Sequence, residues 1–195
     1  MIRAAFQGLA RSLLAAARGA VGLSAPRITE DRRVLEQVIL PAFAQRPAGQ
    51  RVLFVGCAAY TKAYAGLFTA HDYWTIDPVA RRRRYGAQRH IVDYLQSLDS
   101  HFADSYFDII ICNGVLGWGL NEAEQAEAAF AACYRHLREE GDLLLGWNDV
   151  APRNRVPPNQ VHALQRYEPC TFAPLQTSML RVPGPNRHVF SFYRK

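Results

Sequence analysis

Residues 107–113 read FDIIICN, and residues 51–56 read RVLFVG. Each segment is a short apolar run that stops at a residue suited to a turn, Asn113 in the first and Gly56 in the second. Strands that are buried on both faces of a parallel sheet have this pattern. We therefore predict that these two segments are strands of an α/β sheet.

Outward from these strands, apolar runs continue to alternate with helical segments. A strand, a helix and a second strand form a right-handed βαβ unit, and such units build a parallel sheet with helices on both faces. Three further strands are predicted, at YWTID (73–77), RHIVD (89–93) and DLLLGW (142–147).

Two helices are predicted between the strands. Residues 61–68 can form a short helix with Thr61 as its N-cap. Residues 121–138 form a longer helix, because Asn121 and Glu124 have the spacing of a capping box and the apolar side chains share one stripe.

The end of the chain breaks the alternation. SMLRV (178–182) and HVFSFYR (188–194) are separated by a short link that contains PGPN. Two strands with so short a link form an antiparallel hairpin. The sheet is therefore predicted to be mixed, with the hairpin at one side.

The chain begins with two predicted helices. Residues 1–26 form a basic amphipathic helix, which can lie on an anionic membrane or dock on a partner or on its own domain. Residues 29–45 form the second helix, which Pro41 should bend or end early. We divide the chain into a helical extension, 1–48, and one domain, 49–195.

Composition limits the classes of function. The 195 residues are 49% hydrophobic and 21% charged, which excludes a disordered or collagen-like chain. Part of the net charge of +6 is the run Arg81–Arg84, for which we expect a solvated face, with nucleic-acid contact as the less favoured alternative. Cysteine and histidine spacings predict no metal site and a reduced, cytoplasmic protein, with peripheral membrane contact through residues 1–26 left open.

Ligands of open α/β sheets bind beyond the carboxyl ends of the strands. Asp77 ends a predicted strand 21 residues after Gly56, the offset at which a carboxylate accepts the hydroxyls of an adenosine ribose. The alternative is a helix cap, because Pro78 follows. Asp93 and Tyr94 end the next strand and can hold an adenine amine and flank its ring, or equally cap a helix.

Two loops carry further candidates. Residues 113–120 contain three glycines and Trp118, which favours backbone close to a ligand beside an aromatic wall, although Trp118 could instead cover the core. Trp147 and Asn148 precede a proline-rich stretch, 151–158, that is either a rim of the substrate site or a solvated linker.

In this order the segments resemble class I S-adenosylmethionine-dependent methyltransferases of the type 11 kind. Residues 52–60, VLFVGCAAY, are similar to the family's V-L-D-x-G-C-G-x-G. Residues 107–116 resemble its FDxVxxxxVL segment, and residues 137–143, LREEGDL, resemble its turn into strand five. The resemblance implies a three-layer Rossmann-like fold with seven strands in the order 3-2-1-4-5-7-6, strand seven being antiparallel.

Three residues depart from the family pattern. Phe54 replaces the acidic residue, and Ala58 and Tyr60 replace the second and third glycines. A left-handed backbone at Ala58 would cost about 1 kcal/mol or more. No general base or other catalytic residue is identified.

The resemblance implies S-adenosylmethionine as cofactor and methyl transfer to a small molecule. The alternatives are a non-catalytic binding or scaffold protein, an RNA or protein methyltransferase, and a nicotinamide-dependent enzyme, whose glycine fingerprint is missing. The residues expected at the acceptor are Trp118, Trp147 and Asn148, and also Tyr60 and Asn113. The residues expected at the cofactor are Gly56, Cys57, Ala58, Tyr60, Thr61, Asp77, Pro78, Asp93, Tyr94, Asn113 and Val115.

Overall fold

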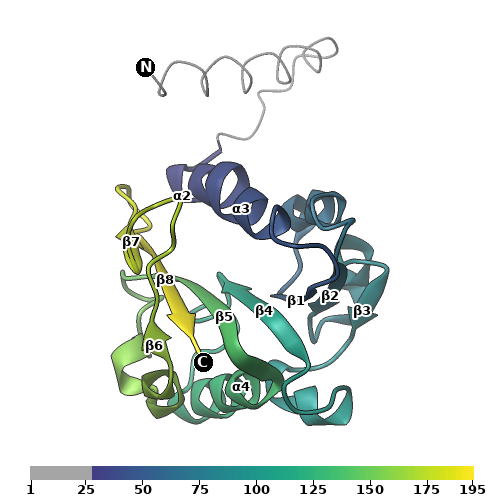
Figure 1. Ribbon diagram of the computed structural model, residues 1–195. Helices are drawn as coiled ribbons and strands as arrows, with labels where there is room; N and C mark the ends of the chain where they lie inside the picture. Colours follow the sequence, from purple (N-terminus) through teal and green to yellow (C-terminus); the bar gives the residue numbers. More distant parts are fainter. Residues whose placement is uncertain (1–27) are drawn as a thin grey trace, which may run out of the picture.

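A computed structural model of the chain describes residues 28–195. The predicted helix at residues 1–26, with its possible membrane or partner contact, lies outside the described residues. Figure 1 shows three layers, in which a central sheet has the helices α2 and α3 on one face and α4 on the other. This confirms the predicted three-layer architecture.

The sheet has the order β3-β2-β1-β4-β5-β8-β6, and β7 also pairs with β8. The strands β1 to β5 are parallel to their neighbours, and β8 is antiparallel to β5. The predicted order and the antiparallel hairpin are thus confirmed. The bounds are β1 Arg51–Val55, β2 Asp72–Ile76, β3 Arg89–Ile91, β4 Phe107–Asn113, β5 Leu137–Asn148, β6 Glu168–Pro169, β7 Met179–Arg181 and β8 His188–Arg194.

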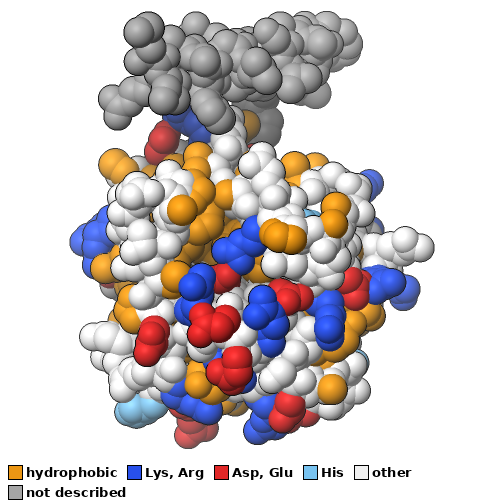
Figure 2. Space-filling model, viewed as in Figure 1, with side chains coloured by type: hydrophobic (Ala, Val, Ile, Leu, Met, Phe, Trp, Pro, Cys, Tyr) orange, Lys and Arg blue, Asp and Glu red, His pale blue; other side chains and the backbone are white. Residues whose placement is uncertain are grey.

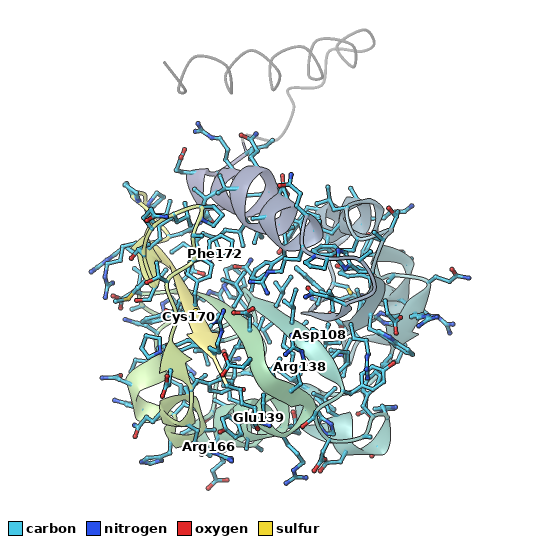
Figure 3. All side chains as sticks on the ribbon, viewed as in Figure 1. Asp108, Arg138, Glu139, Arg166, Cys170 and Phe172 are labelled. Atoms are coloured by element: carbon cyan, nitrogen blue, oxygen red, sulfur yellow. The ribbon has the colours of Figure 1, made fainter. Side chains whose placement is uncertain are left out.

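The edge of the sheet differs from the prediction, because two short strands, β6 and β7, replace one. Both pair with β8. Between them the chain leaves the edge and buries Phe172, whose ring stacks on Phe192 at 4.4 Å between centroids. Phe172 and Cys170 in Figure 3 belong to this loop, which borders a cleft of about 280 Å³ beside α3. The sheet therefore has eight strands instead of seven.

The helix before the sheet runs from Glu30 to Ala44 without a break. It consists of α2, Glu30–Val34, a π-helical turn, Leu35–Ile39, and α3, Leu40–Ala44. The prediction that Pro41 ends the helix early is wrong. Proline cannot donate to the preceding turn, and the chain widens there so that the Leu40 amide donates to the carbonyl of Leu35.

Two predicted helices differ in detail. The short helix predicted at residues 61–68 is present as the 3₁₀ helix η2, Ala59–Gly66, and its N-cap is Ala58 instead of Thr61. α4 spans Ala123–His136, so the capping box at Asn121 is wrong, and Glu122 is the N-cap. The other 3₁₀ helices are η3 Ala80–Tyr85, η4 Leu95–Ser100, η5 Pro158–Gln160 and η6 His162–Arg166.

α4 also ends earlier than predicted, because the chain becomes extended at Leu137. This side chain is fully buried and pairs with Phe107 at the start of β4. The register then shifts, and Glu140 has a φ of +60°. The turn that the sequence places at Gly141 is therefore a bulge inside β5.

Alternate residues of the strands pack against the two helical layers. One core cluster lies on the α4 side and includes Leu53, Ile110 and Leu145. The other joins Phe54 and Phe190 of the sheet to the α2–α3 helix. That helix therefore shares the core of the sheet and lies across its face. None of the helices within residues 28–195 has the length and apolarity needed to cross a membrane.

Candidate active site at the carboxyl ends of the strands

Asp77 follows β2 and is 1% exposed. Its Oδ2 accepts a hydrogen bond from the Cys57 amide at 2.8 Å, and its Oδ1 accepts one from the Val79 amide at 2.9 Å. The Arg82 guanidinium lies 3.3 Å from Oδ2. The bond to Val79 closes a local turn and is not the helix cap of the alternative interpretation, because the N-cap of η3 is Val79, with no side-chain cap. The bond to Cys57 ties the carboxylate to the turn after β1. Because a carboxylate has about four acceptor positions, it can accept further hydrogen bonds.

The turn after β1 has a left-handed residue at Gly56, with a φ of +84°. An added Cβ there would lie 3.1 Å from the Val115 side chain, so both conformation and space favour glycine. Ala58 has φ −145° and ψ 170°, which is extended backbone, so the replacement of a family glycine costs no left-handed strain. The Thr61 hydroxyl accepts a hydrogen bond from the Ala58 amide at 3.1 Å.

Two side chains of this turn, Cys57 and Tyr60, are unreactive. Burial, with a smaller contribution from the charge of Asp77, raises the pKa of the Cys57 thiol to about 11, so Cys57 stays protonated and is no nucleophile. The Tyr60 ring lies 4.0 Å from the guanidinium carbon of Arg32 in α2, and burial raises the pKa of its phenol. Tyr60 is thus packed against α2.

Asp93 and Tyr94 follow β3. Asp93 accepts a hydrogen bond from the Tyr94 amide at 2.7 Å, and its Oδ2 lies 2.8 Å from His101 Nε2. The hydrogen bond from His101 is the main cause of the lowered pKa of Asp93. The side chains of Val92 and Tyr94 are 43% and 58% exposed. This position offers exposed apolar surface beside a carboxylate.

A network of neutral polar groups links the ends of β4, β5 and β8. His188 Nε2 lies 3.1 Å from the Asn113 side-chain oxygen, and His188 Nδ1 lies 3.4 Å from Asn148 Oδ1. Trp118 Nε1 donates to Asn148 Oδ1 at 3.3 Å. A Cβ at Gly146 would lie 1.8 Å from the Asn113 oxygen, so only glycine leaves room for this arrangement.

His188 is the residue of this network that sequence reasoning missed. It is 4% exposed, and burial lowers its pKa to about 4, so the imidazole is neutral at neutral pH. The charge of Asp31, at the start of α2, raises the pKa but contributes less than burial. The only signal in the sequence was a lone histidine at the start of an apolar strand.

The two expected tryptophans face different surroundings. Trp118 is 54% exposed, and the Arg153 guanidinium carbon lies 3.5 Å from its ring centroid. Trp147 is 7% exposed and belongs to the core cluster on the α4 side, where it borders a cleft of about 720 Å³ with Pro157. Trp147 therefore lies on the opposite face of the sheet from the network of Asn113 and His188.

Exposed large hydrophobic side chains gather at this end of the sheet. Within residues 28–195 there are seven, and the loops that follow β1, β3 and β4 supply four of them: Tyr60, Val92, Tyr94 and Trp118. Pro78, after β2, is also exposed. Such a concentration at the carboxyl ends of parallel strands marks the ligand site of an open α/β sheet.

Comparison with known proteins agrees with this geometry. Residues 53–145, from β1 into β5, match a family model described as a methyltransferase domain. This match, together with the fold, supports a class I S-adenosylmethionine-dependent methyltransferase family for the chain. A search of curated proteins returned no match.

Solved structures share the fold of this methyltransferase. A TehB-like SAM-dependent methyltransferase from Corynebacterium glutamicum is 18% identical, with a TM-score of 0.59 over 97% of this chain and 96% of the other. The N-methyltransferase NodS from Bradyrhizobium japonicum, in complex with S-adenosylhomocysteine, is 17% identical, with a TM-score of 0.63 over 89% and 93%. The 1,6-didemethyltoxoflavin-N1-methyltransferase of Burkholderia thailandensis is 20% identical, with 0.54 over 80% and 75%.

The residues of this methyltransferase fit S-adenosylmethionine, the cofactor of the family. A Cβ added at Gly114, with a φ of +69°, would meet no heavy atom within 4 Å, so the space beside the end of β4 is open. Asp77 retains acceptor capacity next to the Gly56 turn. Arg82, whose guanidinium pairs with Asp77, is 48% exposed and can move away at little cost.

Proposed function

We propose that this methyltransferase transfers the methyl group of S-adenosylmethionine to a small molecule bound between the ends of β4 and β5 and the helix α2. The observation that carries the proposal is the buried carboxylate of Asp77, bonded to the turn after β1. It lies at the same end of the sheet as the open space at Gly114 and the exposed aromatic side chains. These are the features that an adenosyl ligand requires.

The chain's own residues divide the work of holding the cofactor. Asp77 accepts hydrogen bonds from the ribose hydroxyls, and Val92 and Tyr94 cover the adenine, whose amine lies near Asp93. The turn at Gly56 and the open space at Gly114 take the amino-acid part. When bound, the sulfonium supplies a strongly electrophilic methyl group, so the protein has mainly to orient the acceptor.

The acceptor side is lined by side chains that position a ligand. Tyr60 and Trp118 present aromatic faces, each with an arginine within 4.0 Å. Asn148 holds the Trp118 indole, and His188 is neutral. Such a mixture of aromatic surface and a few fixed polar groups is typical of small-molecule sites. The N-methyltransferase and the toxoflavin-precursor methyltransferase among the structural relatives support this class of acceptor.

Calorimetric titration with S-adenosylhomocysteine tests the cofactor assignment. The substitution Asp77→Ala removes charge-assisted hydrogen bonds, each of which contributes roughly 1.5–3 kcal/mol, and should weaken affinity by at least about 100-fold. Asp104→Ala, at an exposed position after η4, is the matched control and should bind as the unchanged protein does. Unchanged affinity of Asp77→Ala would refute the ribose assignment.

The same titration distinguishes the proposed function from the scaffold alternative. A non-catalytic protein with this fold predicts no heat of binding at millimolar S-adenosylhomocysteine. The contacts of Asp77 with Cys57 and Arg82 and of Asp93 with His101 would then serve the fold alone.

A second candidate acceptor is RNA. It is favoured by the run Arg81–Arg84 in η3, which is exposed and adjoins Asp77 through Arg82. If RNA is the acceptor, Arg83→Ala with Arg84→Ala should weaken binding of a short structured RNA and reduce its salt dependence. Equal and weak RNA binding by both proteins would leave the small-molecule proposal standing.

A further inference from the structure

The network behind the acceptor site contains a conflict of hydrogen-bonding roles. As placed, both nitrogens of the His188 ring face side-chain amide oxygens, one of Asn113 and one of Asn148. A neutral imidazole has one N–H and one acceptor nitrogen, so it cannot donate to both. Which atom of an amide is oxygen and which is nitrogen is decided by its partners.

The partners of Asn148 fix its orientation. Its Oδ1 accepts from the Trp118 indole at 3.3 Å, and an indole can only donate. Its Nδ2 donates to the backbone carbonyl of Asn186 at 2.9 Å, and a carbonyl can only accept. The Asn148 oxygen therefore faces His188, and the proton of the neutral imidazole is on Nδ1.

Within residues 28–195, no hydrogen-bond partner holds the Asn113 side-chain oxygen toward His188. Apart from the contact with His188, no hydrogen bond within residues 28–195 engages its side chain. Its other terminal atom is not among the buried polar atoms without a partner, so that atom reaches the open end of the sheet. A doubly protonated ring would satisfy two oxygens, but His188 is 4% exposed, and no carboxylate of residues 28–195 hydrogen-bonds to it. The charge of Asp31 favours protonation, but less than burial opposes it.

We infer that His188 is a positioning residue, whose unprotonated Nε2 accepts a hydrogen bond from the Asn113 amide nitrogen and so turns the Asn113 oxygen toward the acceptor site. The site then presents a fixed hydrogen-bond acceptor beside the open space at Gly114. This orientation follows from the network alone. Its use in binding an acceptor rests on the proposed function.

Gly146 keeps the two side chains in contact. A Cβ at this position would lie 1.8 Å from the terminal atom of Asn113 and 2.9 Å from His188 Nε2. Gly146→Ala should therefore separate the amide from the ring without altering either group. Gly66 is the matched control, because an added Cβ there meets nothing within 4 Å.

Nitrogen NMR of the imidazole rings in the full-length ¹⁵N-labelled protein at pH 7 tests the inference. The His188 signals, assigned by their loss in His188→Gln, should show a protonated Nδ1 and an unprotonated Nε2. In Asn113→Asp the carboxylate cannot donate to Nε2, so the proton should move to Nε2 and the pKa of His188 should rise by more than one unit. A ring that already carries its proton on Nε2 would keep the same tautomer in Asn113→Asp.

Three outcomes overturn the inference: an Nε2–H ring in the unchanged protein, an imidazolium at pH 7, or a tautomer that Asn113→Asp leaves untouched. Gly146→Ala should weaken the preference for a proton on Nδ1, whereas Gly66→Ala should preserve it. Identical His188 signals in these two variants would also count against the inference. Titration of the same samples with S-adenosylhomocysteine reports separately on the proposed function. If the protein shows the expected tautomer but does not bind S-adenosylhomocysteine, the proposed function is rejected and the inferred orientation of Asn113 stands.

Discussion

The two ends of the parallel strands are held together by different chemistry. At the amino ends the contacts are ion pairs: Asp108 with Arg138, and Asp142 with Arg46 and Arg194. Figure 3 labels Asp108 and Arg138 side by side, and Figure 2 shows acidic and basic side chains intermingled over the same region. At the carboxyl ends of β4 and β5 a network of amides, an indole and an imidazole joins the strands. Ion pairs of Asp77 with Arg82 and of Asp149 with Arg181 lie beside this network.

We expect the two ends of the strands to contribute differently to stability and to ligand binding. Ion pairs at the amino ends tie the start of β5 to the turn after α3 and to β8, at the end of the sheet away from the candidate site. Neutral hydrogen bonds at the carboxyl ends are directional, so they fix which atom faces the site. The comparison predicts that changes at the amino ends alter unfolding, whereas changes at the carboxyl ends alter binding as well.

The largest effect on stability is expected from Asp142→Ala. Its side chain is 11% exposed and pairs with two arginines, which the substitution leaves without their partner. We expect a loss of about 3 kcal/mol in the free energy of unfolding, measured with urea. Affinity for S-adenosylhomocysteine should not change. Glu140→Ala, at a side chain that is 78% exposed and 3.9 Å from Arg194, should cost less than about 0.5 kcal/mol.

A pH titration of stability probes the carboxyl ends. The folded pKa of His188 is about 4, below the ordinary value of 6.5, so the unfolded chain binds the proton more tightly. Stability is therefore complete above pH 6.5 and falls as the pH is lowered toward 4. By linkage the loss between pH 8 and 4.5 is about 2.5 kcal/mol. His188→Gln should remove this slope, and the same slope in both proteins would assign it to other groups.

A smaller effect than those of Asp142 and His188 is expected from Gly56→Ala. A left-handed alanine costs about 1–2 kcal/mol, and the added methyl group pushes on Val115 at 3.1 Å. Stability should fall by about 1.5 kcal/mol. Adding Val115→Ala removes the collision but not the backbone cost, so the two terms can be separated by denaturation of both variants. Complete recovery in the double variant would show that Gly56 bears no conformational strain.

The sequence predicted those parts of the fold that depend on local pattern. The strands Arg51–Val55 and Phe107–Asn113 have the expected bounds, because their apolar runs stop sharply. The predicted carboxyl end of α4 is wrong, because burial of Leu137 beside Phe107 is a tertiary contact that outweighs helical periodicity. The split edge was missed for the same reason, since Phe172 gains burial only against a strand that comes later in the chain.

The site was predictable only where a residue follows its own strand. The offset and position of Asp77 and Asp93 single them out as candidates in the sequence, but their contacts with Arg82 and His101 do not follow from it. His188 is 75 residues from Asn113 and enters the site along an antiparallel strand. No spacing rule covers such a pair. The approach of α2 to this end of the sheet, through Arg32 and Tyr60, likewise depends on packing.

The divided edge strand also limits how this protein can associate. β6 has two residues and β7 has three, and Pro169 in β6 lacks an amide hydrogen that a neighbour could use. At the opposite border β3 has three residues and begins with the exposed Arg89. Short, charged or interrupted borders are poor templates for another strand. Pairing of either edge strand with a strand of a second molecule, and hence edge-to-edge aggregation, is therefore disfavoured.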